Sequence, residues 1–162
     1  IVVAIDPAVT ANTESDETAI AVAGVGSDGD YYMLSIDGYR LPPQQWATKA
    51  LEAYDRWQAD KIVCEVNNGG DMVIETIERV CEGLGRSANV EAIRASRGKT
   101  LRAEPIAALY EQGRVHHVGV FAEAEDQMCA FPIANEHDDL VDAAVYALSD
   151  LSNQGAPNIR FF

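Results

Sequence analysis

Apolar and polar residues alternate in blocks along the first forty positions, and this pattern predicts three strands. The chain opens with the unbroken apolar run Ile1–Ile5, which Asp6 and Pro7 close. Such a run predicts a strand that is buried on both faces and central in its sheet. Thr18–Val25 and Tyr31–Leu41 are predicted as the next two strands. The Asp-Gly signal in the turn between them indicates a hairpin, so we expect these two strands to be antiparallel neighbours.

The remainder of the chain alternates between helical periodicity and short apolar runs. The spacing predicts helices at 44–58, 72–83, 101–112, 121–131 and 138–151, and strands at 61–66, 90–93 and 115–118. Residues 95–100 are polar and basic and are predicted as a loop. We therefore expect an α/β fold in which an antiparallel three-strand meander is followed by strands that alternate with helices, in one mixed sheet of about five or six strands.

Composition narrows the class of protein. With 162 residues and 48% hydrophobic residues, the chain has the size and balance of one globular domain. No apolar run approaches the roughly 18 residues that a membrane span needs. The three cysteines, Cys64, Cys81 and Cys129, are widely spaced and form no CxxC pair. This pattern favours a reducing compartment, and we expect all three to be buried small hydrophobic residues.

The charge is unevenly distributed along the chain. The formal net charge is −14. Residues 1–39 hold seven acids and no Lys or Arg, and residues 115–159 hold eight acids and again no Lys or Arg. Six of the 12 basic residues fall between Arg86 and Arg114. An acidic cluster can concentrate divalent cations and a basic patch beside it can hold a polyanion, although ordinary surface charge explains the composition equally well.

Carboxylates occur where the predicted strands end and the last helix begins. Asp6 closes the first strand, Glu65 lies near the end of another buried strand, and Asp138, Asp139 and Asp142 open the last helix. If the two strands are parallel neighbours, both acids emerge at the same edge of the sheet, where ligands of α/β proteins bind. Converging carboxylates repel one another, and hard divalent cations relieve that repulsion. The pattern suits a site with two metal ions about 3.5–4 Å apart that hydrolyses a phosphodiester.

Each of these signals has a structural alternative when taken alone. Asp6 can be a plain strand-to-turn residue, Glu65 an ion-paired strand end, and Asp138 a helix cap. The segment Gly98-Lys99-Thr100 imitates the end of a P-loop, but Ile93 stands where that motif requires glycine, so nucleotide binding there is rejected.

Three histidines offer weaker candidates for chemistry. His116 and His117 have no third nitrogen or sulfur ligand near them in the sequence, which favours a surface or substrate-side role over a metal site. His137 lies beside the acids, but a lone histidine is more often structural than catalytic.

Several blocks of the sequence together resemble a known family. The blocks are Ile1-Val2-Val3-Ala4-Ile5-Asp6-Pro7-Ala8, Asp16-Glu17-Thr18-Ala19-Ile20, Cys64-Glu65-Val66-Asn67-Asn68-Gly69-Gly70-Asp71, Gly98-Lys99-Thr100-Leu101-Arg102-Ala103-Glu104-Pro105, Gly113-Arg114-Val115-His116-His117 and His137-Asp138-Asp139-Leu140-Val141-Asp142-Ala143. They resemble the nuclease domain of the large terminase subunits that package DNA in tailed bacteriophages. The resemblance implies an RNase H-like fold of the retroviral integrase superfamily over residues 1–152, with residues 153–162 as a flexible C-terminal tail.

The resemblance also implies a site and an activity. By its motifs, Asp6, Glu65 and Asp139 match the metal ligands of the family, with Asp142 as a second acid of the last helix. We expect Mg²⁺ or Mn²⁺ in a two-metal site that cuts double-stranded, concatemeric DNA and leaves a 3′-hydroxyl. The basic residues expected to contact DNA phosphates are Arg97, Lys99 and Arg102.

The family sets the expected context as well. Terminases carry an ATPase motor domain upstream, and this chain begins without Met, so we expect an excised domain. The expected partners are double-stranded DNA, that motor domain, the portal and the small terminase subunit, with no membrane, in the cytoplasm of the infected bacterial host.

Two other functions remain open. The spacing from Asp139 to Ala143 is also similar to that of Holliday-junction resolvases, which would be dimeric and prefer four-way junctions. A non-catalytic RNase H-like module would only bind DNA or a motor partner. A complete set of mutually repelling carboxylates argues against that second alternative.

Overall fold

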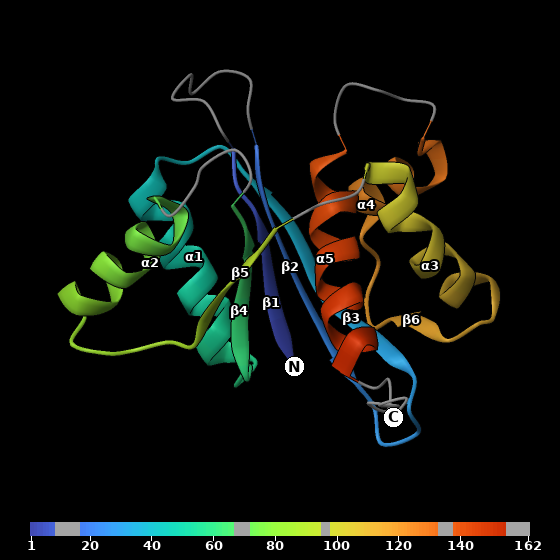
Figure 1. The fold of residues 1–162 in the computed structure, drawn as a ribbon, viewed down its shortest axis with the longest axis horizontal. Coiled ribbons are helices and arrows are strands. Elements are labelled where there is room, and N and C mark those ends of the chain that lie inside the picture. The colour runs from blue at the N-terminus through green and yellow to red at the C-terminus, as the bar shows by residue number, and fades with distance from the viewer. Residues whose placement is uncertain (9–16, 67–71, 95–97, 133–137, 155–162) are drawn as a thin grey trace, which may run out of the picture.

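A computed structural model describes residues 1–8, 17–66, 72–94, 98–132 and 138–154. Within these ranges the chain forms one mixed sheet with helices on both faces (Figure 1). The strands are β1 (Val2–Asp6), β2 (Thr18–Val25), β3 (Tyr31–Tyr39), β4 (Lys61–Glu65), β5 (Val90–Ile93) and β6 (Val115–His117). The helices are α1 (Pro43–Arg56), α2 (Met72–Gly83), α3 (Lys99–Glu111), α4 (Ala122–Ala130) and α5 (Asp139–Gln154).

The six strands follow the order β5-β4-β1-β2-β3-β6. β1, β2 and β3 form the expected antiparallel meander. β4 joins β1 in parallel, β5 joins β4 in parallel, and β6 pairs in parallel with the start of β3. The prediction of a buried central first strand is confirmed, since Val2–Ile5 are at most 1% exposed and β1 has a partner on each side.

The side chains of the sheet point alternately to two different helical layers. Val3, Ile5 and Ile62 pack with α1 and α2, and we call this side the α1–α2 face. Val2, Ala4 and the residues that alternate with them pack with α5, against which α3 and α4 lie, and we call this side the α5 face. Figure 1 shows α1 and α2 on one side of the strands and α3, α4 and α5 on the other.

The centre of the α5 face is made of small side chains. Ala4, Ala19, Ala21 and Ala23 are completely buried there, and α5 presents Ala143, Ala144 and Ala147 among its own buried residues. Side chains without a γ-carbon allow a helix to approach a sheet more closely than Leu or Ile would. This close approach carries the first turn of α5 to the edge of the sheet where β1 ends.

Some expected boundaries differ from the structure. α3 begins at Lys99 rather than at Leu101, with Gly98 at the N-cap position. Lys99 therefore belongs to the first turn of a helix and not to a loop. α5 extends to Gln154, past the expected end at residue 151 and two residues into the expected tail. Residues 155–162 of that tail and residues 95–97 of the expected loop lie outside the described residues.

The burial of the cysteines and the length of the helices bear on two further expectations. Cys64 and Cys81 are buried as expected, but the expectation for Cys129 is wrong, because Cys129 is exposed on α4. None of the described helices is long and apolar enough to cross a membrane.

Candidate active site

The alternation of side chains in the sheet brings the strand acids to one place. Asp6 follows Ala4 by two positions and Glu65 follows Val63 by two positions, and both Ala4 and Val63 lie on the α5 face. β1 and β4 are parallel neighbours with Ile5 opposite Cys64, so their carboxyl ends coincide. Asp6 and Glu65 therefore leave the same edge of the sheet on the same face, towards the first turn of α5.

The pKa of Asp6 is raised by its burial and by the charges of the other acids. Burial, followed by the charges of Asp142, Asp139 and, more weakly, Glu65, raises the pKa of Asp6 to about 8, against an opposing effect of Lys99. Glu65 and Asp142 are each 5% exposed, so water screens these charges poorly. Asp6 is therefore affected by the charges of the three other predicted site acids, one from a strand and two from the last helix.

The pKa of Asp139 is affected by the same group of charges and indicates a further acid near the site, Glu17. Burial raises the pKa of Asp139, Lys99 opposes this, and Asp138 and Glu17 add to the rise. Glu17 was not predicted as a site residue. Its position carried a usable signal, because Glu17 precedes Ala19 by two residues and Ala19 pairs with Asp6 on the adjacent strand. The same two-residue alternation that places Asp6 on the α5 face predicts Glu17 there.

Two basic residues of α3 hold the acids of the last helix. The Lys99 Nζ lies 2.5 Å from Asp138 Oδ1 and 2.7 Å from Asp142 Oδ2. Arg102 Nη2 donates to Asp142 Oδ1 at 3.2 Å, and its guanidinium lies 5.2 Å from the ring centre of Tyr146. Burial lowers the pKa of Lys99, but the hydrogen bonds to Asp138 and Asp142 outweigh it, so the pKa lies above its ordinary value.

These contacts change the picture for the residues expected to bind DNA. The Lys99 side chain is 50% exposed and can reach solvent, whereas that of Arg102 is 18% exposed. Both meet carboxylates of the site rather than forming a separate basic patch. Arg97 and His137 lie outside the described residues.

The set of donors suits a hard cation. Asp6, Glu65, Asp139 and Asp142 offer only carboxylate oxygens, which are the ligands that Mg²⁺ and Mn²⁺ prefer, and the raised pKa of Asp6 shows that their negative charges repel one another. Among the described residues, no three His, Cys, Asp or Glu side chains lie close enough to hold a metal ion. The residues fit the cation by chemistry, while Asp138 and Asp142 face Lys99.

The two described histidines lie away from this edge. β6 pairs with Tyr31–Met33, which lie beside the end of β2 and hence at the opposite end of the sheet from Asp6. His116 stacks on Tyr32 and contacts Asp30 at 3.1 Å. His117 joins Glu125 at 2.9 Å and the Tyr110 hydroxyl at 2.8 Å. Both therefore have protein partners, and neither joins the carboxylates.

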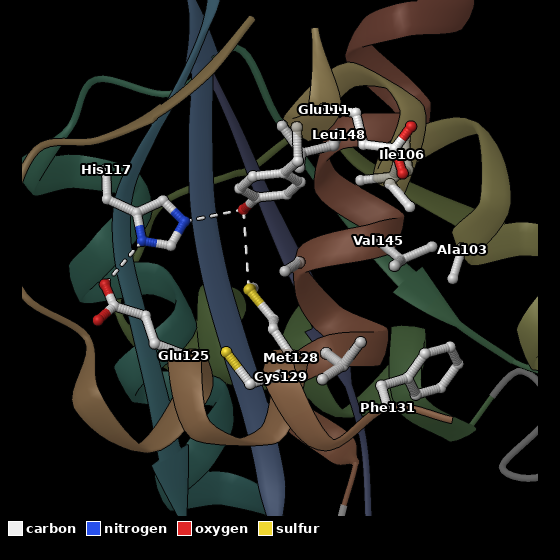
Figure 2. A pocket seen from close by; sticks show the side chains of 14 residues that line it. Ala103, Ile106, Glu111, His117, Glu125, Met128, Cys129, Phe131, Val145 and Leu148 are labelled. Carbon is white, nitrogen blue, oxygen red and sulfur yellow. Dashed lines mark hydrogen bonds and ion pairs between the residues drawn. The ribbon is translucent and has the colours of Figure 1, made fainter. Parts of the chain in front are cut away.

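A large apolar pocket occupies the space between α3, α4, α5 and β6. Its volume is about 480 Å³, and its walls include Ile106, Met128, Phe131 and Val145. Figure 2 shows His117 at one side of the pocket, between Glu125 and the tyrosine hydroxyl, while Glu111 lies at the other side. The walls are mostly apolar and the carboxylates described above are absent from them, so the pocket is not the place for phosphodiester chemistry.

The chain matches a known protein-family model over most of its length. The model of the Terminase RNaseH-like domain matches residues 3–151. This chain belongs to the Terminase RNaseH-like domain family. No curated protein sequence matches the chain.

Solved structures show the same fold. The large terminase nuclease of the thermophilic phage G20c, solved with bound zinc, is 17% identical with a TM-score of 0.66, covering 91% of this chain and 80% of that one. The yeast mitochondrial Holliday junction resolvase is 11% identical with a TM-score of 0.58, covering 90% and 75%. The Fowlpox virus resolvase, solved with Holliday junction DNA, is 11% identical with a TM-score of 0.53, covering 94% and 99%. The RNase H-like fold expected from the sequence is confirmed.

Proposed function

We propose that this terminase-family domain is a divalent-metal-dependent endonuclease that cuts double-stranded, concatemeric DNA during viral DNA packaging. The observation that supports the proposal is the position of Asp6, Glu65 and Asp139 at the ends of β1 and β4 and the start of α5, where burial and then neighbouring carboxylates raise the pKa of Asp6 to about 8. A site that concentrates negative charge in this way is poor at binding DNA alone and suited to binding cations.

In this proposal Asp6, Glu65 and Asp139 hold Mg²⁺ or Mn²⁺, with Asp142 beside them. Bound in pairs, such ions would activate water and stabilise the leaving oxygen, and the product would carry a 3′-hydroxyl. The protein contributes rigidity, because β1 and β4 fix two of the ligands within the sheet and the alanine-lined α5 face fixes the third. Preorganised ligands avoid the cost of gathering like charges at the moment of reaction.

The site's surroundings suggest how DNA would be held. With a net charge of −14, the domain repels a duplex over most of its surface. The Lys99 side chain, half exposed at the start of α3, and Arg97 are the proposed phosphate contacts. Arg102, fixed between Asp142 and Tyr146, is proposed to position the site and to contact phosphate from its exposed side. Binding should therefore be weak and salt-sensitive.

The wider setting is proposed from the family. An ATPase motor domain, the portal and the small terminase subunit would be the partners, and the cytoplasm of the infected bacterial host would be the place of action. A motor domain that holds the duplex would compensate for the weak grip of this domain.

The test is cleavage of plasmid DNA with Mg²⁺ or Mn²⁺, with and without EDTA. Asp6→Asn, Glu65→Gln and Asp139→Asn should each abolish nicking while the circular dichroism spectrum is retained. Glu75→Gln, on the exposed side of α2, is the matched control and should cut as the wild type does. Wild-type nicking by any of the three site variants would remove that residue from the site, and absence of metal-dependent cleavage by the wild type would favour a non-catalytic binding module.

A resolvase-like nuclease is the second candidate, because the fold matches resolvases of yeast and Fowlpox virus. A resolvase should cut a four-way junction much faster than a linear duplex of the same sequence and should be a dimer in sedimentation. Equal cleavage of both substrates by a monomer would favour the terminase function.

A further inference from the structure

Two of the three acids at the start of the last helix already have a counter-ion that belongs to the chain. We call Asp138 and Asp142 the helix carboxylates. Lys99 bridges them, and Arg102 takes the other oxygen of Asp142, so both oxygens of Asp142 accept from a cationic side chain. Asp142 is 5% exposed, and a charge that is so poorly solvated needs such a partner in the metal-free protein.

In the proposed function Asp142 also contributes to the metal site, so a second metal ion would need the same oxygens. A carboxylate oxygen that accepts from an ammonium at 2.7 Å cannot also hold a divalent ion at about 2.1 Å without bringing the two cations into strong repulsion. Lys99 and a metal ion are therefore alternative occupants beside Asp142.

Of the two basic residues, Lys99 is the one that can leave. Its side chain is half exposed and flexible, whereas Arg102 is mostly buried and lies over Tyr146. α3 itself is lightly anchored, because Ile106 is its one buried residue and hollows of about 480 and about 330 Å³ flank it. A DNA phosphate offers the ammonium a replacement for the carboxylates, in a position nearer to solvent.

We propose that Lys99 is a built-in competitor for the metal at the helix carboxylates, and that duplex DNA relieves this competition by drawing Lys99 onto a phosphate. This inference rests on the proposed nuclease function and adds a regulation of the same site. Metal loading beside Asp142 and DNA binding then strengthen each other, and by linkage each ligand raises the affinity for the other by the same factor. The domain remains incompletely loaded with metal until DNA is in place.

The test measures metal binding rather than cleavage. Mn²⁺ is titrated by calorimetry into the wild type, Lys99→Gln, Lys99→Arg and the exposed control Arg79→Gln, each with and without a short duplex whose linkages are cleavage-resistant phosphorothioates. Without DNA, Lys99→Gln should bind Mn²⁺ at least tenfold more tightly at its weaker site than the wild type. DNA should tighten Mn²⁺ binding by the wild type several-fold and that by Lys99→Gln hardly at all.

The two further variants keep the test interpretable. Lys99→Arg retains the charge and should resemble the wild type without DNA, and Arg79→Gln on α2 should resemble it in every arm. Circular dichroism melting checks that Lys99→Gln is folded. If that variant is unfolded, the Lys99→Arg and wild-type titrations decide, because equal Mn²⁺ affinity with and without DNA in both would overturn the coupling.

The outcomes separate this inference from the function on which it rests. If wild type and Lys99→Gln both bind Mn²⁺ equally and Asp6→Asn does not bind it, the metal site stands and the competition by Lys99 is refuted. If none of the variants binds Mn²⁺, with or without DNA, the metal-dependent function itself fails, and the competition fails with it.

Discussion

The two faces of the sheet are built from the same strands but differ in what they carry. The α1–α2 face is filled with large aliphatic side chains such as Ile5 and Ile62, which bury surface and carry no charge. The α5 face is lined with alanine in its centre and ends in Asp6 and Glu65 at the sheet edge. The α1–α2 face stabilises the fold by burying large side chains. The α5 face has small side chains at its centre, which allow a helix with acids at its start to pack closely against the sheet. This difference indicates that the site depends on how closely α5 packs against the sheet.

The largest effect is expected from lifting α5 off its face. Ala21→Leu adds three carbons at a completely buried position of β2 that faces α5. It should lower cleavage by about 100-fold, because displacing catalytic groups by about 1 Å has effects of that size. Val22→Leu, at the next residue and on the α1–α2 face, is the matched control. It should lower the melting temperature while leaving cleavage by the folded protein within about twofold; equal loss of activity in both would refute the comparison.

A cavity on the α1–α2 face should lower stability without affecting chemistry. Ile77 of α2 is completely buried, so Ile77→Ala should lower the free energy of unfolding by about 2–5 kcal/mol in urea titrations. Plasmid nicking, measured well below the melting temperature, should remain near the wild-type rate. Glu78→Ala, on the exposed side of the same helix, should change neither quantity. Loss of nicking by folded Ile77→Ala would show that this face also positions the site.

The α5 face should make stability depend on pH in the metal-free protein. The pKa of Asp6 is raised from 3.8 to about 8, first by burial and then by neighbouring carboxylates. Between these values the unfolded chain releases the proton while the folded chain keeps it, so stability is lost as pH rises from about 4 to about 8. In EDTA, Asp6→Asn should remove this loss and exceed the wild type by a few kcal/mol at pH 8, and by far less at pH 4. Parallel profiles for both proteins would contradict the raised pKa.

The smallest effect is expected from an ion pair that matches Lys99 in distance but not in burial. Lys49 lies 2.7 Å from Glu52 on α1, as Lys99 does from Asp142, but the Glu52 side chain is 57% exposed and that of Asp142 only 7%. Lys49→Ala should leave the free energy of unfolding nearly unchanged and should not alter Mn²⁺ binding. A shift in Mn²⁺ affinity as large as that expected for Lys99→Gln would indicate a general charge effect and not a local competition.

The central place of β1 and the three-strand meander were predictable because they follow from local patterns, and the common edge of Asp6 and Glu65 was predicted on the condition that β1 and β4 are parallel neighbours. A doubly buried apolar run identifies β1, and two parallel strands must end at one edge. The alternation of side chains also predicts that Glu17 lies on the α5 face, although Glu17 was not predicted as a site residue. The pairing of Lys99 and Arg102 with Asp142 was not predictable, since 43 and 40 positions separate these residues and no local pattern reports how α3 packs on α5. The early start of α3 at Lys99 was missed for a related reason, because Gly98 caps the helix through its backbone conformation alone.

The central place of β1 also determines when the site disappears as the protein opens. β1 is hydrogen-bonded to β2 on one side and β4 on the other, and Val2–Ile5 are shielded from solvent by helices on both faces. Amide protons in such a strand exchange with deuterium only when the whole domain unfolds, whereas those of terminal turns and lightly packed helices such as α3 exchange through local openings. Asp6 is attached directly to this most protected strand. Local opening of α3 will therefore release Lys99 from its carboxylate partners long before any opening disturbs Asp6.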